Sequence, residues 1–261
     1  MEPHHRAAIA RWSDHARDQP GHLALIVAGS LTKGYGRPDS DVDGLIVVTD
    51  EEMARRRSTG ELTFFSADLC GYPGGYVDAK YVDHAFLEAV AARGSEPARS
   101  AFIGALVPWS EIDGLPTLIE RIVAYPEVDR EEKIGRFFAQ LSAAQWYVRE
   151  AEKHDDPYLA SWAATRLVLF GCRLVLAHNR VLFPYHKWLM RTVGELADRP
   201  DDLLDLATAL LASPTPENAD AFATSIVFFT EWPAASTAWS AQFVLDSEWN
   251  WLEHPPPVED L

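Results

Sequence analysis

The chain is poor in cysteine and has no long apolar run, and each shortage excludes a class of protein. Its 261 residues include two cysteines, Cys70 and Cys172, which excludes a disulfide scaffold and a four-cysteine zinc site. The most apolar early run, residues 23–28, is far too short to span a bilayer. No secretory signal is visible. We therefore expect a cytoplasmic protein with no membrane partner.

Basic residues are also few in comparison with acidic ones. Lys and Arg number 23 against 39 Asp and Glu, which gives a formal net charge of −16. Because binding to nucleic-acid backbones needs a cationic footprint, we expect no nucleic-acid partner. The charge suits a cationic small substrate, although acidity alone usually serves solubility. The composition, 48% apolar and 24% charged, is that of a folded chain.

The periodicity of apolar residues divides the chain near residue 126. Residues 1–126 mix helix and strand signals, whereas residues 127–261 carry helix signals. Strands are expected at 23–28, 42–48, 62–65 and 76–82, and helices at 4–17, 51–57 and 84–92. The later helices are expected at 131–153, 157–178, 185–196, 200–212, 216–232 and 235–252. These signals predict an α+β domain followed by an all-α domain.

The candidate metal- and phosphate-binding residues lie in one segment between two expected strands. The first strand ends in Gly29-Ser30, and Asp41-Val42-Asp43 begins the next. Residues two apart on a strand share a face, so Asp41 and Asp43 are predicted to point the same way. Two close carboxylates repel unless a cation lies between them, and Mg²⁺ takes such oxygens together with substrate phosphates. The glycine allows close approach to a phosphate, and the serine hydroxyl can hold it. The alternative is that both aspartates are solvated turn residues.

A third carboxylate is needed to complete such a site. Asp78 follows a glycine turn in the middle of an expected strand and is the best placed, while Asp83 is a competing candidate. An ordinary edge-strand carboxylate is the alternative for Asp78. With three carboxylates, two metal ions could stabilise both the attacking and the leaving oxygen of a phosphoryl displacement.

These residues resemble a known family. Gly29-Ser30, Ser40-Asp41-Val42-Asp43 and then Asp78 are similar to the nucleotidyltransferase fold of the DNA polymerase β type. The nearest resemblance is to aminoglycoside- and lincosamide-nucleotidyltransferase-like proteins. It covers residues 20–125, and residues 112–119 resemble the segment that closes the catalytic domain. Gly44 departs from the pattern, because a bulky apolar residue usually follows the second aspartate. It could mark a bend or a close ligand approach.

The resemblance implies a fold and an activity. The catalytic domain, residues 1–126, would be a small mixed sheet flanked by helices, and the helical domain, residues 127–261, would close the substrate cleft. The enzyme would transfer a nucleoside monophosphate, most simply AMP from ATP, to a hydroxyl of a small acceptor and release pyrophosphate. Asp41, Asp43 and Asp78 would be the catalytic residues and the ligands of two Mg²⁺ ions. Gly29, Ser30, Lys33 and Arg37 would bind the nucleotide.

The helical half offers weaker candidates. Lys187, in the polar and aromatic segment 173–189, is expected to reach the nucleotide phosphates, or else to be a surface lysine. Arg173 and His178 also fit the loose pattern of HEPN-type ribonucleases, which the acidic charge disfavours. Glu150 and Glu152 are further candidates for a general base or for binding an amine-rich substrate.

Several alternatives to this activity stay open. One is adenylylation of a protein partner, and another is a non-catalytic nucleotide-binding or scaffold protein. A homodimer that shares its cleft is possible.

Overall fold

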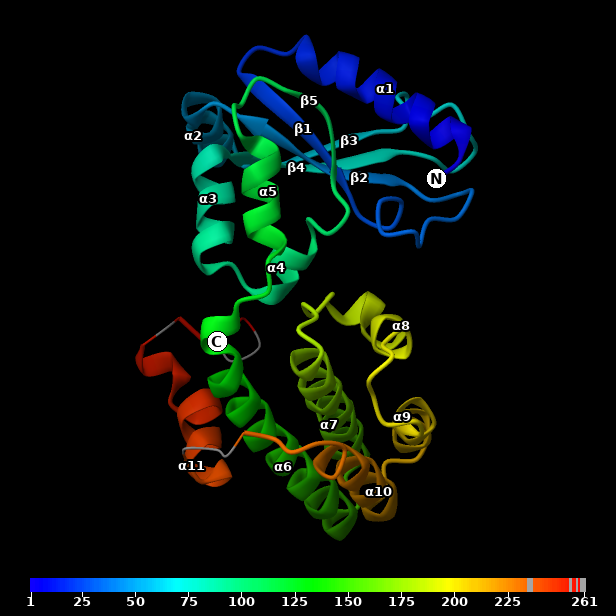
Figure 1. Ribbon diagram of the computed structural model, residues 1–261, viewed down its shortest axis with the longest axis vertical. Helices are drawn as coiled ribbons and strands as arrows, with labels where there is room; N and C mark the ends of the chain where they lie inside the picture. Colours follow the sequence, from blue (N-terminus) through cyan, green and yellow to red (C-terminus); the bar gives the residue numbers. More distant parts are fainter. Residues whose placement is uncertain (234–236, 254, 257, 259–261) are drawn as a thin grey trace. The chain divides into compact units, whose positions relative to one another are not determined.

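Figure 1 shows the computed structural model, which describes residues 1–233, 237–253, 255–256 and 258. The chain forms two compact units, Met1–Ala124 and Tyr125–Leu261. The first contains a five-stranded mixed sheet with helices beside it, and every described element of the second is helical. The predicted α+β class is confirmed.

The sheet brings two distant segments together as parallel neighbours. Its strands are β1 (His22–Ala28), β2 (Val42–Val48), β3 (Thr63–Ser66), β4 (Val77–Asp83) and β5 (Leu106–Ser110). They lie in the order β3-β4-β2-β1-β5, and β2 and β4 are parallel while the other pairs are antiparallel. The sequence pattern missed β5, because Pro108 within so short a run argues against a strand.

Helix α1 (Pro3–Arg17) packs on one face of the sheet through Trp12, which is fully buried. Gly44 of β2 lies beneath this ring. A Cβ on Gly44 would come within 2.7 Å of Trp12 Cη2 and 2.6 Å of the backbone oxygen of Ile26. The glycine that departs from the family pattern therefore makes room for α1, which explains it without a bend or a ligand.

The opposite face is covered at one end by further helices, namely α3 (His84–Arg93), α4 (Glu96–Ser100) and α5 (Leu115–Val123). Leu87 and Leu115 of these helices pack against Ile26 and Val47 of the sheet. Asp83 accepts a hydrogen bond of 2.7 Å from the backbone N–H of Phe86 and so caps α3. Since it is also paired with Arg57, Asp83 has a structural role.

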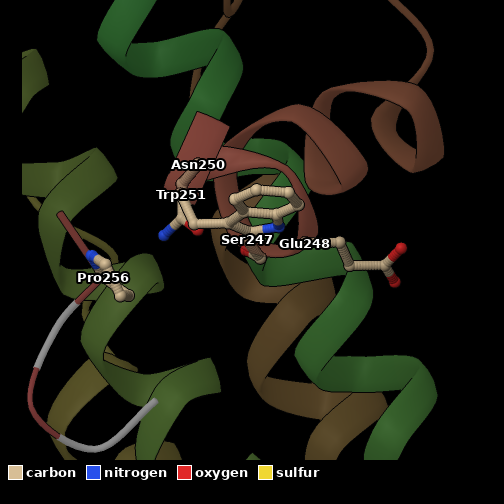
Figure 2. A pocket seen from close by; sticks show the side chains of 5 residues that line it. All are labelled: Ser247, Glu248, Asn250, Trp251 and Pro256. Carbon is tan, nitrogen blue, oxygen red and sulfur yellow. The ribbon is translucent and has the colours of Figure 1, made fainter. Parts of the chain in front are cut away.

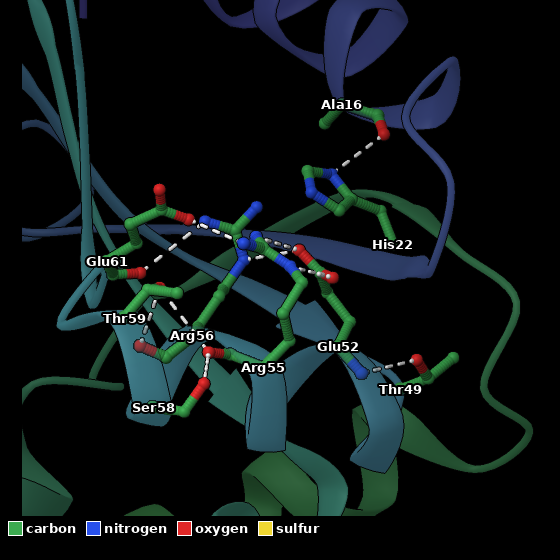
Figure 3. A network of polar contacts seen from close by, with 9 residues as sticks. All are labelled: Ala16, His22, Thr49, Glu52, Arg55, Arg56, Ser58, Thr59 and Glu61. Carbon is green, nitrogen blue, oxygen red and sulfur yellow. Dashed lines mark hydrogen bonds and ion pairs between the residues drawn. The ribbon is translucent and has the colours of Figure 1, made fainter.

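Helix α2 (Asp50–Thr59) carries a network of charged side chains, which Figure 3 shows. Glu52 binds the guanidinium groups of both Arg55 (2.8 Å) and Arg56 (2.7 Å), and Arg55 also binds Glu61 (2.7 Å). Chiefly the hydrogen bond from Arg55 lowers the pKa of Glu52 to about 2. The Arg56 guanidinium lies 3.3 Å from the centre of the Tyr81 ring, which ties α2 to β4.

In the second unit, two long helices form most of the core. They are α6 (Arg130–His154) and α7 (Pro157–His178), and α7 packs closely on α10 (Pro216–Val227) at Gly171. By length and composition α7 could cross a membrane, with a mean hydropathy of 1.5, but half of that stretch is buried inside the protein. Its buried residues belong to the core of this unit, which is compatible with a soluble protein. The remaining elements are η1 (Glu127–Asp129), η2 (His186–Trp188), α8 (Leu189–Gly194), α9 (Leu203–Ala212), α11 (Trp239–Phe243), η3 (Val244–Glu248) and η4 (Asn250–Leu252).

The expected helices of this unit were partly wrong in their extents. The segment 185–196 forms η2 and the short α8 instead of one helix. The helix expected at 216–232 ends at Val227, and the Trp232 side chain donates a hydrogen bond of 3.0 Å to the backbone oxygen of Ile226. The helix expected at 235–252 is divided into α11, η3 and η4, and Ala235 lies outside the described residues.

Candidate functional site

The turn after β1 is built around Gly29. This glycine has φ of +81°, which few other residues adopt, and a Cβ there would lie 2.7 Å from the Cβ of Asp43. The turn continues tightly, since the backbone N–H of Tyr35 donates a hydrogen bond of 2.9 Å to the oxygen of Ser30. Gly29 therefore lets the Asp43 side chain lie directly against the turn that the sequence predicted as a phosphate cradle.

Two of the predicted carboxylates occupy paired positions. Asp43 on β2 and Asp78 on β4 are partners in the parallel register, so their side chains leave the sheet on the same face. Asp41 immediately precedes β2 and is two residues from Asp43, so it continues the same row. The face is the one that carries Leu45, which packs with the α3–α5 core. Asp78, near the start of β4, is exposed on this face.

Tyr76 lies among these carboxylates and was missed from the sequence. Its hydroxyl donates a hydrogen bond to Asp41, and this bond is the main reason why the pKa of the Tyr76 phenol is raised. The negative charges of Asp41, Asp43 and Asp78 act in the same direction. A signal was present, because Tyr76 stands two residues before Asp78 and so faces the same side.

Lys33 and Arg37 behave differently in the loop between the two halves of the motif. Burial lowers the pKa of the Lys33 ammonium, and the nearby charge of Asp43 acts against this shift. Lys33 is thus within electrostatic reach of the Asp43 carboxylate. Arg37 is exposed and makes two hydrogen bonds, of 3.0 and 3.2 Å, to the carboxylate of Asp39. Its predicted contact with nucleotide would require exchange of this partner.

The loop before Asp41 is held by side chains from two other segments. The Tyr72 hydroxyl donates a hydrogen bond of 2.7 Å to the backbone oxygen of Ser40. The His4 Nε2 lies 2.8 Å from the backbone oxygen of Pro38, and its ring packs 4.4 Å from that of Tyr72. Helix α1 therefore helps to set the position of Asp41.

The carboxylates fit magnesium only in part. In the part of the chain that the structure describes, no three His, Cys, Asp or Glu side chains gather closely enough to hold a metal ion by themselves. Mg²⁺ is, however, usually held by one or two carboxylates together with water and substrate phosphates. Oxygen ligands from Asp43 and Asp78, beside the turn at Gly29, suit an ion that arrives with its nucleotide.

Lys187 belongs to the second unit and is exposed. Its ammonium lies 5.3 Å from the centre of the Trp188 ring. The two residues of the ribonuclease-like pattern each have partners within this unit. Arg173 lies between the rings of Phe137 (4.4 Å) and Phe183 (4.5 Å).

His178, the other member of that pattern, lies 2.6 Å from the carboxylate of Asp198. Of the two glutamates, Glu150 is paired with Lys153 and His154 of its own helix.

A hollow of about 370 Å³ lies near the C-terminus, and Figure 2 shows the side chains that line it. It is lined by Ser247, Glu248, Asn250, Trp251 and Pro256. It contains none of the residues that the sequence singled out.

Comparison with known proteins adds a partial match and a distant structural likeness. A family model described as a domain of unknown function (DUF4037) matches residues 109–189, a range that includes Lys187 but none of the three aspartates. No curated protein matches the chain. Among solved structures, a nucleotidyltransferase-like protein from Exiguobacterium sibiricum is 13% identical, with a TM-score of 0.48. The alignment covers 98% of this chain and 83% of that one. A likeness of this degree transfers no site residue.

Proposed function

We propose that the protein transfers a nucleoside monophosphate from a nucleoside triphosphate to a hydroxyl group of a small acceptor. The observation that carries this proposal is the pairing of Asp43 with Asp78 across parallel strands, next to the turn at Gly29. Paired carboxylates beside a glycine turn suit a cation that brings phosphates with it. ATP is the donor that we would test first.

The reaction exchanges one bond to phosphorus for another. The acceptor oxygen forms a bond to the α-phosphorus, the bond from that phosphorus to the β-phosphate oxygen breaks, and pyrophosphate leaves. The hydroxyl proton goes to a carboxylate, for which Asp78 is our candidate because it is exposed at the site. Magnesium held by Asp43 and Asp78 together with substrate phosphates, with Asp41 as the third predicted ligand, would supply positive charge against the phosphates.

The turn after β1 and the loop that follows it would bind the phosphates. The Ser30 hydroxyl and the backbone N–H groups of the turn would donate hydrogen bonds to the β- and γ-phosphates, and the Lys33 ammonium would add a positive charge. Without a cation, the aspartates would repel a triphosphate. We therefore propose that activity depends on magnesium. The net charge of −16 favours a cationic acceptor. The cytoplasmic location and a homodimer stay predictions.

The experiment measures pyrophosphate release from ATP and Mg²⁺ across a panel of hydroxylated acceptors. Asp41→Asn and Asp43→Asn should abolish release, because the substitution keeps the side-chain size and removes the charge. Asp14→Asn, at an exposed position of α1, is the matched control. Undiminished turnover in Asp43→Asn would refute the proposal. Nucleotide binding without release on any acceptor would favour a non-catalytic nucleotide-binding protein.

A further inference from the structure

An aromatic pair, the exposed Phe65 and the half-buried Tyr76, borders the carboxylates on the side of the edge strand. Phe65 of β3 is 66% exposed, although phenylalanine is usually buried. Its ring lies 5.1 Å from that of Tyr76, centre to centre, at an angle of 34°. Together they form one apolar surface, which we call the Phe65–Tyr76 platform. A tilted aromatic pair next to charged groups, with the Phe65 ring exposed, is a suitable surface for binding a ring.

The register places this platform directly beside Asp78. Phe65 and Asp78 are partners in the antiparallel pairing of β3 with β4, so both side chains leave the same face of the sheet. Asp78 in turn is the partner of Asp43. Phe65, Asp78 and Asp43 thus form a row across three strands, and the Tyr76 ring lies beside it in contact with Phe65.

The turn at Gly29 lies at the other end of this row. Across the sheet the order is β3, β4, β2 and β1, so the platform and the turn after β1 flank the two paired carboxylates on opposite sides. In an in-line displacement at phosphorus, the attacking and the leaving oxygen also lie on opposite sides. If pyrophosphate leaves toward Gly29, the acceptor must approach from the platform.

We propose that the Phe65–Tyr76 platform binds the acceptor, and that the acceptor presents the flat face of a ring. A cyclic polyol and an aromatic alcohol share this chemistry, whereas an open-chain polyol lacks it. The platform does not bind the nucleobase. This inference rests on the proposed function for the direction of attack, while the ring-binding surface itself can be tested without turnover.

The test combines binding with kinetics in Phe65→Ala. Saturation-transfer NMR would compare myo-inositol and 4-hydroxybenzyl alcohol with the open-chain sorbitol. We expect ring probes to contact the wild type more strongly than sorbitol, and Phe65→Ala to weaken them roughly 3- to 10-fold, as for loss of one ring contact. Phe86→Ala, at another exposed phenylalanine of the same unit, is the control.

The kinetic arm separates the acceptor from the nucleotide. Phe65→Ala should raise the KM of an active acceptor by a similar factor and leave the Kd of ATP with Mg²⁺ unchanged. Tyr76→Phe keeps the ring, so it should keep acceptor affinity even if kcat changes. Weaker ATP binding in Phe65→Ala would overturn the inference, because the platform would then bind the base.

The NMR experiment tests whether the Phe65–Tyr76 platform binds a ring, even if no turnover is found. Ring-probe signals equal to those of sorbitol, or unchanged in Phe65→Ala, overturn the platform. Signals lost in Phe65→Ala support it, even if the absence of any pyrophosphate release refutes the proposed reaction.

Discussion

Replacing Gly44 by alanine should destabilise the first unit while leaving the chemistry of the site intact. The added methyl group would lie 2.6 Å from the backbone oxygen of Ile26 and 2.7 Å from the Trp12 ring. Neither neighbour can move easily, because Ile26 is paired in the sheet and Trp12 is fully buried. Overpacking of this kind costs about 3 kcal/mol.

A smaller effect opposes this cost. Alanine restricts the unfolded chain more than glycine does, which stabilises the folded state by about 0.7 kcal/mol. The net loss in the free energy of unfolding is therefore about 2 kcal/mol, or a decrease in Tm of about 8 °C for a unit of this size. Differential scanning calorimetry of wild type and Gly44→Ala measures it.

A double-mutant cycle identifies the cause. Trp12→Phe removes the ring atoms that a methyl at Gly44 would overlap, so Gly44→Ala should cost about 1 kcal/mol less in that background. The overlap with Ile26 remains. If Gly44→Ala is as stable as wild type but binds ATP more weakly, then the packing explanation is wrong and Gly44 serves a ligand.

Three further outcomes test other parts of the structure. Ser30→Ala should weaken ATP binding in calorimetric titrations by about 1–3 kcal/mol, the value of a charge-assisted hydrogen bond, and equal affinity would make Ser30 structural. Glu52→Gln should lower the free energy of unfolding by about 1–2 kcal/mol at pH 7. Because the folded pKa of Glu52 is about 2, below its unfolded value, its contribution is present above about pH 4.5. It is lost as the pH falls toward 2, so denaturation curves of wild type and Glu52→Gln should converge there, and a gap that persists would contradict the ion-pair explanation. Lys187→Ala should raise the KM for ATP in a salt-dependent way, with Lys153→Ala as control, and unchanged kinetics would leave Lys187 a surface lysine.

Features that depend on a local sequence pattern could be predicted from the sequence. The two-residue period of a strand predicted that Asp41 and Asp43 share a face, and β2 has the bounds expected for it. Glycine at the end of an apolar run likewise indicated the turn at Gly29, whose φ is positive. Such features depend on neighbours in the chain, so one segment is enough to predict them.

Features that depend on strand order could not be predicted in this way. The packing of Trp12 on Gly44 and the placement of Phe65 beside Asp78 need the register of strands that are distant in sequence. The cap that Asp83, the competitor of Asp78, makes on α3 was likewise not predicted from the sequence. In the helical half, the apolar period continued past the points where α8 and α11 end, and so it predicted helices that were too long.

The parallel pairing of β2 with β4 has a consequence for how the chain folds. Asp43 and Asp78 are about 35 residues apart and meet only when this pair forms. Closing such a connection costs chain entropy before any contact repays it, and parallel pairing is slow for that reason. Repulsion between the two carboxylates adds to the barrier. By this argument we expect the pairing that creates the candidate site to form after the local β1–β2 and β3–β4 pairs, and a nascent chain has no such site until β4 has been synthesised.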